Sequence, residues 1–511
     1  MAPPAPLQEE AAPLKILFVT SEVRPVVQTG GLADVSAALP AALRHLGADV
    51  RILLPGYRAV LDESKKIRVC ARIEDIPEHG EVRLLSACLP HSEVPLLLVD
   101  YPVYYDREGG PYLDADGREW PDNAWRFGLF SHVAARLGSA QSPLAWRPDI
   151  VHCNDWQSGL APALMHFMSG RKAATLMTVH NLAYQGVFAP QFATRLGLPA
   201  SSFHMEGVEY YGLFSFLKAG LYYADHLSTV SPTYAKEIQS EPLGFGLQGL
   251  LAARTRALTG ILNGVDTERW NPASDPLLPA PFGPGHWDAK QANKTALQQT
   301  LGLEVRPDRP ILGVVSRLTP QKGLDLLLEA APRLLETPVQ IAMVGNGDRD
   351  LERDWLALQA RYPGAVAARI AFDERLSHLV EAGSDIFVMP SRFEPCGLNQ
   401  MYSQLYGTPP VVHFTGGLAD TVVDATAAAV QAGEATGFVF REMTARALEQ
   451  AVRRALDAYR DKRTWRRLQL NGMSRDFSWD HSARGYLALY RSILAARAQP
   501  VARIACSAAL P

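Results

Sequence analysis

The sequence predicts an α/β protein built from two domains, each with a doubly wound parallel sheet. Short apolar segments recur along the chain, such as residues 15–20 (KILFVT) and 310–318 (PILGVVSRL), and each is followed by a loop and a helical pattern. Continuous apolar runs of this length are typical of buried parallel strands. A length of 511 residues requires more than one domain, and a hydrophobic content of 47% is sufficient for two sizeable cores.

Composition excludes several classes of function. The formal net charge is -3 and no long basic stripe occurs, which argues against a nucleic-acid partner. The five cysteines are far apart and none forms a Cys-x-x-Cys pair, which argues against structural zinc and indicates a reducing compartment. The first residues lack the pattern of a secretion signal, and no apolar segment is long enough to cross a bilayer. We therefore expect a cytoplasmic protein with no membrane partner, and disordered or loose tails at residues 1–13 and 496–511.

The chain opens with a strand, a loop containing glycines, a helix and a second strand. The helix is expected at residues 32–46, where Gly47 ends it, and the second strand at residues 48–55. Gly30 and Gly31 lie at the start of the helix, where a backbone can approach a ligand closely. An ordinary tight turn is the alternative interpretation.

Two stretches with different residue patterns follow the second strand. Residues 67–99 alternate between apolar and polar, which predicts hairpin-like strands. Residues 101–126 are rich in Tyr, Trp, Asp and Gly, a composition that often presents groups for stacking on sugars and binding their hydroxyls. A surface loop with buried aromatic side chains explains this composition equally well.

Polar residues end two successive predicted strands. Asn154 and Asp155 end the strand in residues 149–156, and His180 and Asn181 end the strand in residues 174–181. The carboxyl ends of neighbouring parallel strands open onto one crevice, so these residues begin to define a site.

The remainder of the first half is expected to contain one long helix at residues 207–226. A strand and a short helix follow in residues 226–238. Residues 271–288 are dense in Pro and Gly without periodicity, which predicts an interdomain linker or an exposed loop.

The second half repeats the strand–helix order, and its first strand ends in Arg317. Lys322 follows five residues later, across the turn into the helix at residues 319–335. Two such cations can bind a diphosphate, Arg through its planar fork and Lys as a point charge. A solvated charged surface is the alternative.

The stretch from residue 386 to residue 407 carries the most informative pattern. An apolar strand stops at Pro390, Glu394 follows, and a helix begins after Gly397. A carboxylate at a strand-to-helix junction suits a sugar hydroxyl or a developing positive charge better than a phosphate. The alternative is a helix N-terminal Glu that accepts hydrogen bonds from backbone N–H groups.

The hexapeptide TGGLAD occurs twice, at residues 29–34 and 415–420. Its second copy places Gly416 and Gly417 after a strand and before a helix, as Gly30 and Gly31 are placed in the first. Each half therefore offers a glycine loop toward a ligand.

These motifs together resemble the bacterial glycogen synthase family, retaining glucosyltransferases that extend α-1,4-glucan from ADP-glucose. The resemblance runs from about residue 14 to residue 492 and includes HNLAYQG, NGVDTERWNP, VSRLTPQKGLDLL, SRFEPCGLNQ and DFSWDHSA. It implies the GT-B fold, two Rossmann-like doubly wound domains facing across a cleft. The expected bounds are 14–265 for the first domain and 266–480 for the second. A helix at residues 481–495 would return to the first domain.

The resemblance also implies roles for particular residues. Arg317 and Lys322 would hold the donor diphosphate, and Glu394 would bind the glucose hydroxyls. His180 would lie beside the anomeric carbon, and Glu394, His180 and Asp155 form the implied catalytic set. The other implied substrate-binding residues are Gln28, Gly30, Gly31, Asn181, Tyr402, Gly416 and Gly417.

Tyr402 stands where many relatives of the fold carry a second Glu, eight residues after Glu394. The implied partners are ADP-glucose and an α-1,4-glucan or glycogen acceptor. No metal and no other cofactor is implied, and the expected assembly is a monomer or a small homo-oligomer. The implied reaction is attack by the acceptor hydroxyl on the face from which the phosphate leaves.

Three departures from the family pattern concern charge and the site. Gln28 replaces the usual Lys before Thr-Gly-Gly, Asn154 replaces the His of a His-Asp-Trp motif, and His413 and Phe414 replace basic residues before the second motif. Two alternatives therefore stay open, a catalytically weakened glucan-binding paralogue and a synthase that prefers UDP-glucose. A phosphorylase of the same architecture would need a lysine-bound pyridoxal group.

Overall fold

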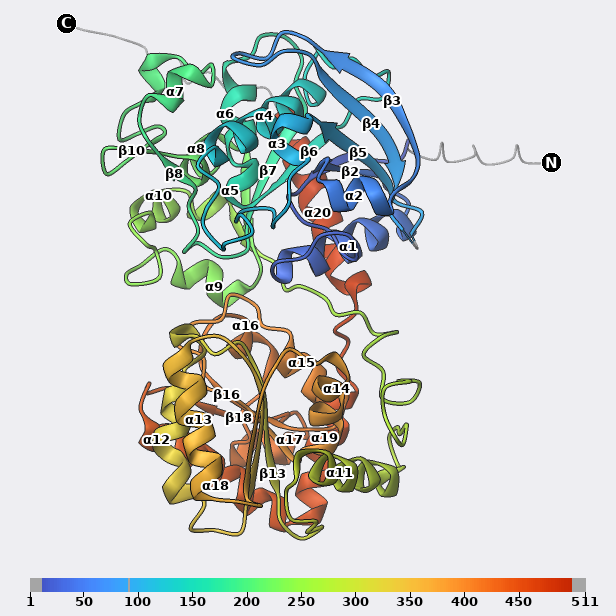
Figure 1. Cartoon of the computed structure of the whole chain (residues 1–511), viewed down its shortest axis with the longest axis vertical. Coiled ribbons are helices and arrows are strands. Elements are labelled where there is room, and N and C mark those ends of the chain that lie inside the picture. The colour runs from blue at the N-terminus through green and yellow to red at the C-terminus, as the bar shows by residue number, and fades with distance from the viewer. Residues whose placement is uncertain (1–11, 91, 499–511) are drawn as a thin grey trace, which may run out of the picture. The chain divides into compact units, whose positions relative to one another are not determined.

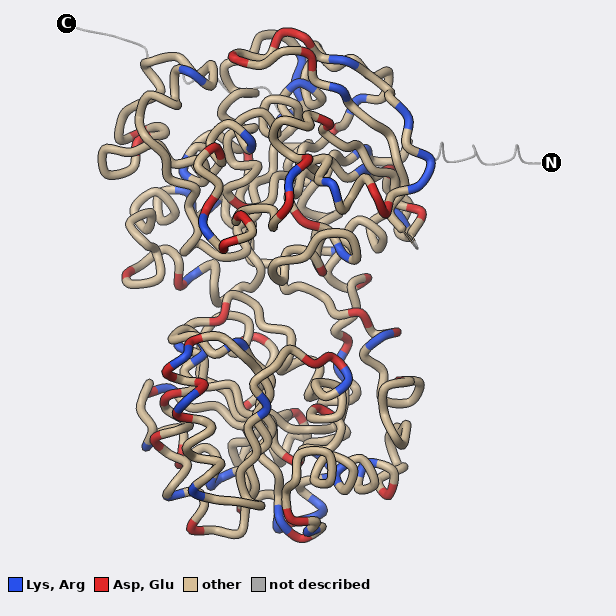
Figure 2. Tube along the Cα trace, viewed as in Figure 1, with Lys and Arg blue, Asp and Glu red and all other residues tan. Residues whose placement is uncertain are grey.

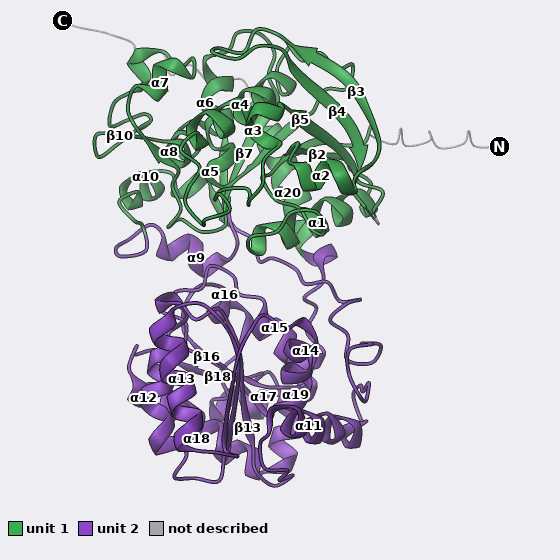
Figure 3. Ribbon diagram, viewed as in Figure 1, with its two compact units in different colours: residues 1–228, 244–259, 482–511 green, residues 229–243, 260–481 purple. Residues whose placement is uncertain are grey.

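The computed structural model describes residues 12–90 and 92–498, which divide into two compact units (Figure 3). Unit 1 comprises residues 1–228, 244–259 and 482–511, and unit 2 comprises residues 229–243 and 260–481. The division differs from the sequence-based boundary after residue 265, because residues 229–243 pack with the second unit. The expected tails fall largely on residues 1–11 and 499–511, which lie outside the described residues, but residues 496–498, predicted to be loose, belong to the last helix.

Unit 1 is built on a nine-stranded sheet with the order β12-β11-β7-β6-β1-β2-β5-β4-β3. Strands β7, β6, β1, β2 and β5 pair in parallel, as the apolar runs predict. Residues 16–19 of β1 are completely buried, because helices cover both faces of this part of the sheet. The strands are β1 (Lys15–Val19), β2 (Asp49–Pro55), β3 (Lys65–Ile73), β4 (Val82–Cys88), β5 (Pro95–Asp100), β6 (Ile150–Asn154), β7 (Ala174–Val179), β11 (His226–Thr229) and β12 (Leu258–Gly260).

The order in which successive strands join the sheet of unit 1 reverses at β1. This strand pairs with β2 on one side and with β6 on the other. In open parallel sheets, ligands bind outside the carboxyl ends of the strands at such a switch point. The loops after β1 and β6 are therefore where a site is expected in this unit.

The edge of the same sheet is antiparallel. Strands β3, β4 and β5 form a meander, which confirms the hairpin-like strands predicted from the alternation at residues 67–99. The helices of unit 1 are α1 (Gly31–His45), α2 (Arg58–Glu63), α3 (Pro102–Tyr105), α4 (Asn123–Leu137), α5 (Asp155–Ser158), α6 (Leu160–Phe167), α7 (Phe192–Arg195), η1 (Ala200–Ser202), α8 (Phe216–Tyr223), α10 (Gln248–Ala253), η2 (Thr255–Ala257) and α20 (Trp479–Ala498).

The prediction of one long helix at residues 207–226 is wrong. This segment instead forms β9 (Glu209–Tyr210) and β10 (Leu213–Ser215), which pair in a small antiparallel sheet with β8 (Val187–Phe188), before α8 begins at Phe216. The Ser215 hydroxyl caps α8 by accepting a hydrogen bond from the Lys218 backbone N–H, and it fixes the start of the helix there.

Unit 2 contains a six-stranded sheet with the order β15-β14-β13-β16-β17-β18, parallel throughout (Figure 1). Its first strand in the sequence, β13, lies in the middle beside β14 and β16, so the switch point of this unit lies between β13 and β16. The strands are β13 (Ile311–Val315), β14 (Gln340–Gly345), β15 (Val366–Ile370), β16 (Ile386–Met389), β17 (Pro410–His413) and β18 (Phe438–Phe440).

Helices pack on both faces of the second sheet and enclose two apolar clusters. The helices of unit 2 are α9 (Pro232–Glu237), α11 (Trp287–Leu301), η3 (Pro320–Lys322), α12 (Leu324–Leu334), α13 (Arg349–Arg361), α14 (Glu374–Gly383), α15 (Asn399–Leu405), α16 (Gly416–Thr421), α17 (Ala427–Ala432), α18 (Ala445–Arg460) and α19 (Lys462–Met473).

The segment at residues 271–288 has little regular structure, as expected, but it is not a free linker. Leu278 and Phe282 are buried in one apolar cluster with Tyr406. Asp275 is also buried, and its carboxylate accepts hydrogen bonds from the Tyr406 hydroxyl and from His378 Nδ1. The prolines and glycines therefore shape a segment that packs on unit 2.

Most of helix α20 belongs to unit 1 although it ends the described chain. Figure 1 shows it in red among the blue and cyan elements of that unit. The hydroxyl of Tyr490 lies 2.8 Å from His152 Nδ1, so the helix is hydrogen-bonded to β6, an inner strand of the sheet. Figure 2 shows both signs of charge interspersed along the two units. None of the helices in residues 12–90 and 92–498 has the length and apolar character needed to span a membrane.

Candidate active site

A short charged contact at the switch point of unit 2 joins Lys322 to Glu394. The Lys322 Nζ atom lies 2.5 Å from Glu394 Oε2, and the Ser391 hydroxyl donates to the same oxygen at 3.0 Å. Glu394 is only 6% exposed. Lys322 follows β13 and Glu394 follows β16, so the pair closes over the point where the sheet changes direction. Both residues are where the sequence predicts a site.

The turn that carries Lys322 fits closely against the end of β16. Gly323 has φ of +65°, and a Cβ atom there would lie 2.0 Å from the carbonyl oxygen of Pro390. Only glycine combines this conformation with this approach. The close fit holds the Lys322 turn beside the strand that leads to Glu394.

Arg317 is exposed, and its guanidinium has no side-chain partner within the described residues. Its backbone is nevertheless fixed. A Cβ atom at Gly345 would meet the Ser316 carbonyl oxygen at 1.8 Å, and one at Gly347 would meet the Leu318 carbonyl oxygen at 2.3 Å. A rigid loop thus presents a guanidinium that has all its donors available for an anion.

Gly416 and Gly417 pack against the backbone that carries Glu394. A Cβ atom at Gly416 would lie 1.9 Å from the Glu394 carbonyl oxygen, and one at Gly417 would lie 2.0 Å from that of Cys396. The Gly417 N–H donates to the Glu394 carbonyl oxygen at 3.1 Å. The glycine pair therefore has a structural reason within unit 2, because it lets α16 hold the Glu394 segment in place.

The N–H of Gly416 is directed at a carboxylate within the same unit. It lies 3.1 Å from both oxygens of Glu237, and the Thr415 hydroxyl donates to the same group at 3.0 Å. Burial raises the pKa of Glu237, and these hydrogen bonds oppose the rise. The expected contact of Gly416 with a phosphate competes with this internal contact.

Tyr402 takes part in a stack of three rings. Its ring lies 3.7 Å from that of Trp270 with 7° between the planes, and the other neighbour of Trp270 is His378 at 3.8 Å. A flat stack of this kind packs α15 against the segment before residue 271. The structure therefore gives Tyr402 a packing contact.

His413 and Phe414, which replace basic residues of the family, both make internal contacts. His413 Nδ1 lies 2.9 Å from the Ser391 carbonyl oxygen and Nε2 lies 3.1 Å from that of Arg441. Burial lowers the pKa of His413, although the two carbonyl oxygens oppose this. The guanidinium of Arg441 lies 3.8 Å above the ring of Phe414. A cation is therefore present beside this loop even though the sequence position before it is not basic.

At the switch point of unit 1, Asp155 and His180 are bonded to each other. Asp155 Oδ1 accepts a hydrogen bond from the His180 backbone N–H at 2.8 Å. His180 Nε2 lies 2.9 Å from Asn154 Oδ1, and the Asn154 amide nitrogen donates to the Val19 carbonyl oxygen. The side-chain orientation of Asn154 is thus fixed, so Nε2 of His180 carries the proton and Nδ1 is the acceptor. The ends of β6 and β7 meet as predicted.

Burial favours the neutral form of both side chains, so it shifts their pKa values in opposite directions. It lowers the pKa of His180 to about 4, so the ring is neutral at pH 7. It raises the pKa of Asp155 to about 7, although backbone N–H groups of His180 and Asn181 oppose the rise. Asp155 also has φ of +53°, a left-handed conformation that costs a non-glycine residue free energy. Strain and a shifted pKa at a strand end are typical of functional sites.

Glu22 was not predicted as a site residue. Its carboxylate accepts hydrogen bonds from the backbone N–H groups of Thr29 at 2.5 Å and Gly30 at 3.1 Å, and from the Tyr112 hydroxyl at 2.5 Å. Burial raises its pKa. The signal was available, because Glu22 follows a buried strand at the switch point. Its partner Tyr112 explains part of the aromatic region at residues 101–126.

Gly30 and Gly31 differ from their counterparts in unit 2. A Cβ atom at either position would meet no atom within 4 Å, and Gly30 is extended with φ of −151°. No packing within the described chain requires glycine here. The close approach of a ligand to this loop stays a prediction.

Gln28 is exposed, and its amide nitrogen lies 3.5 Å from Asp34 Oδ2. The same carboxylate forms an ion pair of 2.9 Å with Arg24. The loop that lacks the lysine of the family therefore still carries a cation on the neighbouring turn. Asn181, the remaining predicted residue, uses its side-chain oxygen to accept the N–H of Ala183 at 3.1 Å.

The candidate site residues of unit 1 and those of unit 2 differ in their chemistry. Unit 2 provides a free guanidinium, an ammonium and a buried carboxylate at one strand edge, a set suited to an anion joined to a polyhydroxyl compound. Unit 1 provides a neutral imidazole and a carboxyl group with a raised pKa. Among residues 12–90 and 92–498, no three side chains of His, Cys, Asp or Glu converge as metal ligands would.

Comparison with known families matches both units. Residues 15–253 match the family model described as starch synthase catalytic domain, and residues 302–468 match the one described as glycosyl transferases group 1. Proteins named glycogen synthase from Nitrosospira multiformis and Dechloromonas aromatica are 56% and 54% identical to this chain. The alignments cover 94% and 95% of this chain and 97% and 99% of those proteins.

Solved structures give the same picture. The catalytic domain of starch synthase IV from Arabidopsis thaliana, bound to ADP and acarbose, superposes with a TM-score of 0.84 at 32% sequence identity, covering 94% of this chain and all of that one. Sucrose-phosphate synthase from Thermosynechococcus elongatus has a TM-score of 0.57 at 20% identity over 94% of this chain and all of its own, which is a likeness of fold alone.

Proposed function

The chain belongs to the glycogen synthase family of GT-B glucosyltransferases, and we propose that it transfers glucose from ADP-glucose to the non-reducing end of an α-1,4-glucan. The observation that carries this proposal is the 2.5 Å contact between Lys322 and Glu394 at the switch point of unit 2. It joins a group that binds phosphate to a group that binds sugar hydroxyls, which are the two parts of a nucleotide sugar.

Arg317 and Lys322 are the groups that would hold the donor diphosphate. As the bond between glucose C1 and the phosphate oxygen breaks, negative charge grows on the leaving ADP. Cations that are already in position stabilise that charge without reorganisation. The fixed backbone around Arg317 and Gly323 provides this pre-organisation.

Glu394 would accept hydrogen bonds from the glucose hydroxyls. A carboxylate that is only 6% exposed and held by Lys322 and Ser391 has a defined orientation, so it can fix the sugar relative to the diphosphate. The sugar carries positive charge in its oxocarbenium-like transition state, which a nearby carboxylate also favours.

His180 and Asp155 would contribute from unit 1. The neutral ring of His180 adds no positive charge beside the anomeric carbon, and its Nδ1 atom can accept a hydrogen bond. The acceptor hydroxyl would attack C1 on the face from which the phosphate leaves, with its proton passing to that phosphate. Gly30, Gly31, Asn181 and Gln28 would line the approach of the donor, and no metal ion is required in this proposal.

A direct test is to incubate the purified full-length protein with glycogen and radiolabelled ADP-glucose or UDP-glucose. We expect incorporation from ADP-glucose at a rate well above that from UDP-glucose. Faster incorporation from UDP-glucose would overturn the donor assignment while keeping the reaction. Failure to incorporate either sugar, together with co-sedimentation of the protein with glycogen, would replace the proposal with a glucan-binding role, for which the exposed Gln28 is the motivating feature.

A further inference from the structure

A cavity of about 650 Å³ lies in unit 2, away from the residues proposed for transfer. Pro310, Val339 and Asp385 line it, and these residues precede β13, β14 and β16. Arg317 and Glu394 follow the carboxyl ends of β13 and β16. Because β13 has five residues, the two ends of the sheet are separated by about 15 Å.

The lining of this cavity is cationic, with five basic side chains and two carboxylates. The carboxylates are already paired. Asp385 forms an ion pair of 2.8 Å with Lys294, and Asp308 forms one of 3.0 Å with Arg306. An anion entering the cavity would therefore meet an excess of positive charge, five basic side chains against two carboxylates.

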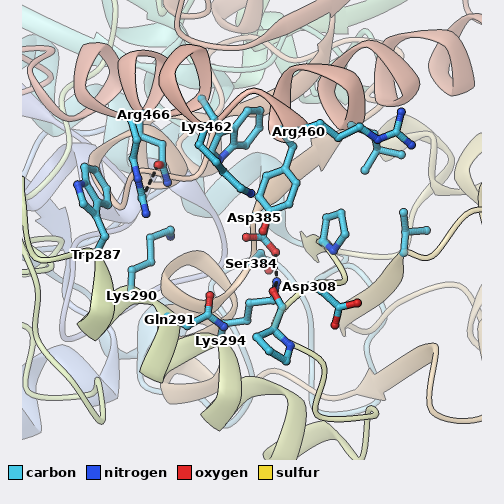
Figure 4. Close-up of a pocket in the computed structure, with 18 of the residues that line it drawn as sticks. Trp287, Lys290, Gln291, Lys294, Asp308, Ser384, Asp385, Arg460, Lys462 and Arg466 are labelled. Atoms are coloured by element: carbon cyan, nitrogen blue, oxygen red, sulfur yellow. Dashed lines mark hydrogen bonds and ion pairs between the residues drawn. The ribbon is translucent and has the colours of Figure 1, made fainter.

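Two of the other basic groups are occupied by internal partners. Lys290 donates to the carbonyl oxygens of Ala382 and Tyr406 at 2.8 and 2.9 Å and to the Thr408 hydroxyl at 2.8 Å, which uses all its donors. Arg460 pairs with Asp457 at 2.8 Å. In Figure 4 its guanidinium points away from the other labelled side chains.

Lys462 and Arg466 remain available. They are four residues apart on α19, so they share one face of the helix. Neither has a carboxylate partner in the part of the chain that the structure describes. Lys462 Nζ lies 3.5 Å above the ring of Tyr459, and the Arg466 guanidinium lies 4.2 Å above that of Trp287 (Figure 4). Arg466 also donates one hydrogen bond to Gln469 Oε1 at 2.9 Å. The aromatic rings hold both cations over the cavity and leave the donors of Lys462 and the other donors of Arg466 for a ligand.

We propose that this cavity binds a small phosphorylated metabolite, with its phosphate between Lys462 and Arg466. The size of the cavity supports a ligand larger than inorganic phosphate, since small-molecule sites typically have volumes of 300–1,000 Å³. The organic part would lie against the apolar wall formed by Val339, Leu456 and Pro307. Burial lowers the pKa of both Lys462 and Arg466, and a bound phosphate would offset this cost.

The test is calorimetric titration of the full-length protein, with saturating ADP present throughout. The probes are ribose 5-phosphate, glycerol 3-phosphate and AMP, with ribose, glycerol, adenosine and inorganic phosphate as comparators. We expect at least one phosphate ester to bind at one site per chain, at least tenfold more tightly than inorganic phosphate and than its own unphosphorylated form.

Variants locate the binding. Lys462→Ala combined with Arg466→Ala should weaken it at least tenfold with an unchanged far-UV spectrum. The matched control is Arg463→Ala, which removes an exposed cation from the same helix outside the cavity and should leave binding unchanged. Absence of binding by all three esters would overturn the proposal. So would equal binding by the double variant and the parent, or equal weakening by Arg463→Ala.

Discussion

Glu394 and Lys322 reach each other from loops that are separated by 72 residues in the sequence. Removing either one leaves the other charge part-buried and without its partner, which is costly. The arrangement therefore gives a direct prediction at the level of one side chain.

Replacing Glu394 with Gln should lower the rate of glucosyl transfer by about 10²–10³-fold, because a charged contact to the reacting sugar is lost. The rate is measured with labelled ADP-glucose and glycogen. Glu449→Gln is the control, since Glu449 pairs with Arg333 and Arg453 in the same unit and has no proposed role in transfer. A Glu394→Gln rate within threefold of the parent would remove Glu394 from the mechanism.

The shifted pKa values in unit 1 predict opposite pH dependences of stability. Folded Asp155, with a pKa of about 7, binds more protons than the unfolded group between pH 4 and 7, so its contribution to the free energy of unfolding falls as pH rises. Folded His180, with a pKa of about 4, binds fewer protons than the unfolded group up to pH 6.5, so its contribution rises.

Denaturant titrations between pH 4 and 7 measure these contributions. The stability of Asp155→Asn relative to the parent should increase with pH, because the variant lacks the fall. The stability of His180→Gln relative to the parent should decrease over the same range. Parallel curves for a variant and the parent would show that the group titrates as it does in the unfolded chain.

A substitution at Gln28 is expected to improve donor binding rather than to impair the enzyme. Gln28→Lys should lower the KM for ADP-glucose about two- to tenfold, a modest gain because the position is exposed and solvent screens the added charge. Gln28→Glu is the opposing variant and should raise the KM. Equal KM values in all three proteins would mean that this loop lies away from the diphosphate.

The sequence predicted those site residues that follow strands directly, because strand ends are recognisable from local apolar runs. Lys322, Glu394, Asp155 and His180 are of this kind. Glu22 also follows a strand, β1, but its contact with Tyr112 joins residues that are 90 apart in the sequence, and no local pattern reveals that contact. The hydrogen bond from His180 to Asn154 likewise depends on how β6 and β7 lie side by side.

Among the elements, the two copies of TGGLAD share a sequence but not a structural role. Gly417 packs against the Cys396 carbonyl oxygen, whereas Gly31 has open space around it. Gly417→Ala should therefore lower the free energy of unfolding by about 1–3 kcal/mol through overpacking. Gly31→Ala should leave stability unchanged and raise the KM for ADP-glucose. Thermal unfolding and donor kinetics of both variants separate these effects, and equal destabilisation by the two would contradict the difference in role.

Element prediction succeeded where one periodicity dominated. The buried strands β1, β13 and β16 were recognised from continuous apolar runs, which only parallel pairing between helix layers explains. The error at residues 207–226 arose because the aromatic and apolar residues there fit a helix as well as short strands. At residues 271–288 the prolines and glycines indicated irregular backbone correctly, but they carried no information on the burial of Leu278 and Phe282.

At the scale of the whole molecule, each unit brings its proposed functional groups to the switch point of its own parallel sheet. The GT-B fold implied by the sequence motifs is confirmed by the family matches and the starch synthase structure. The cavity at the amino ends of the unit 2 strands could not be predicted, because its lining comes from segments spread over residues 287–469.

The most direct test of the account is a crystal structure of the full-length protein with ADP. We predict diphosphate oxygens within about 3 Å of the Arg317 guanidinium and of Lys322 Nζ, with the Glu394 carboxylate facing the position of the sugar. A nucleotide bound elsewhere, with Arg317, Lys322 and Glu394 facing bulk solvent, would contradict it.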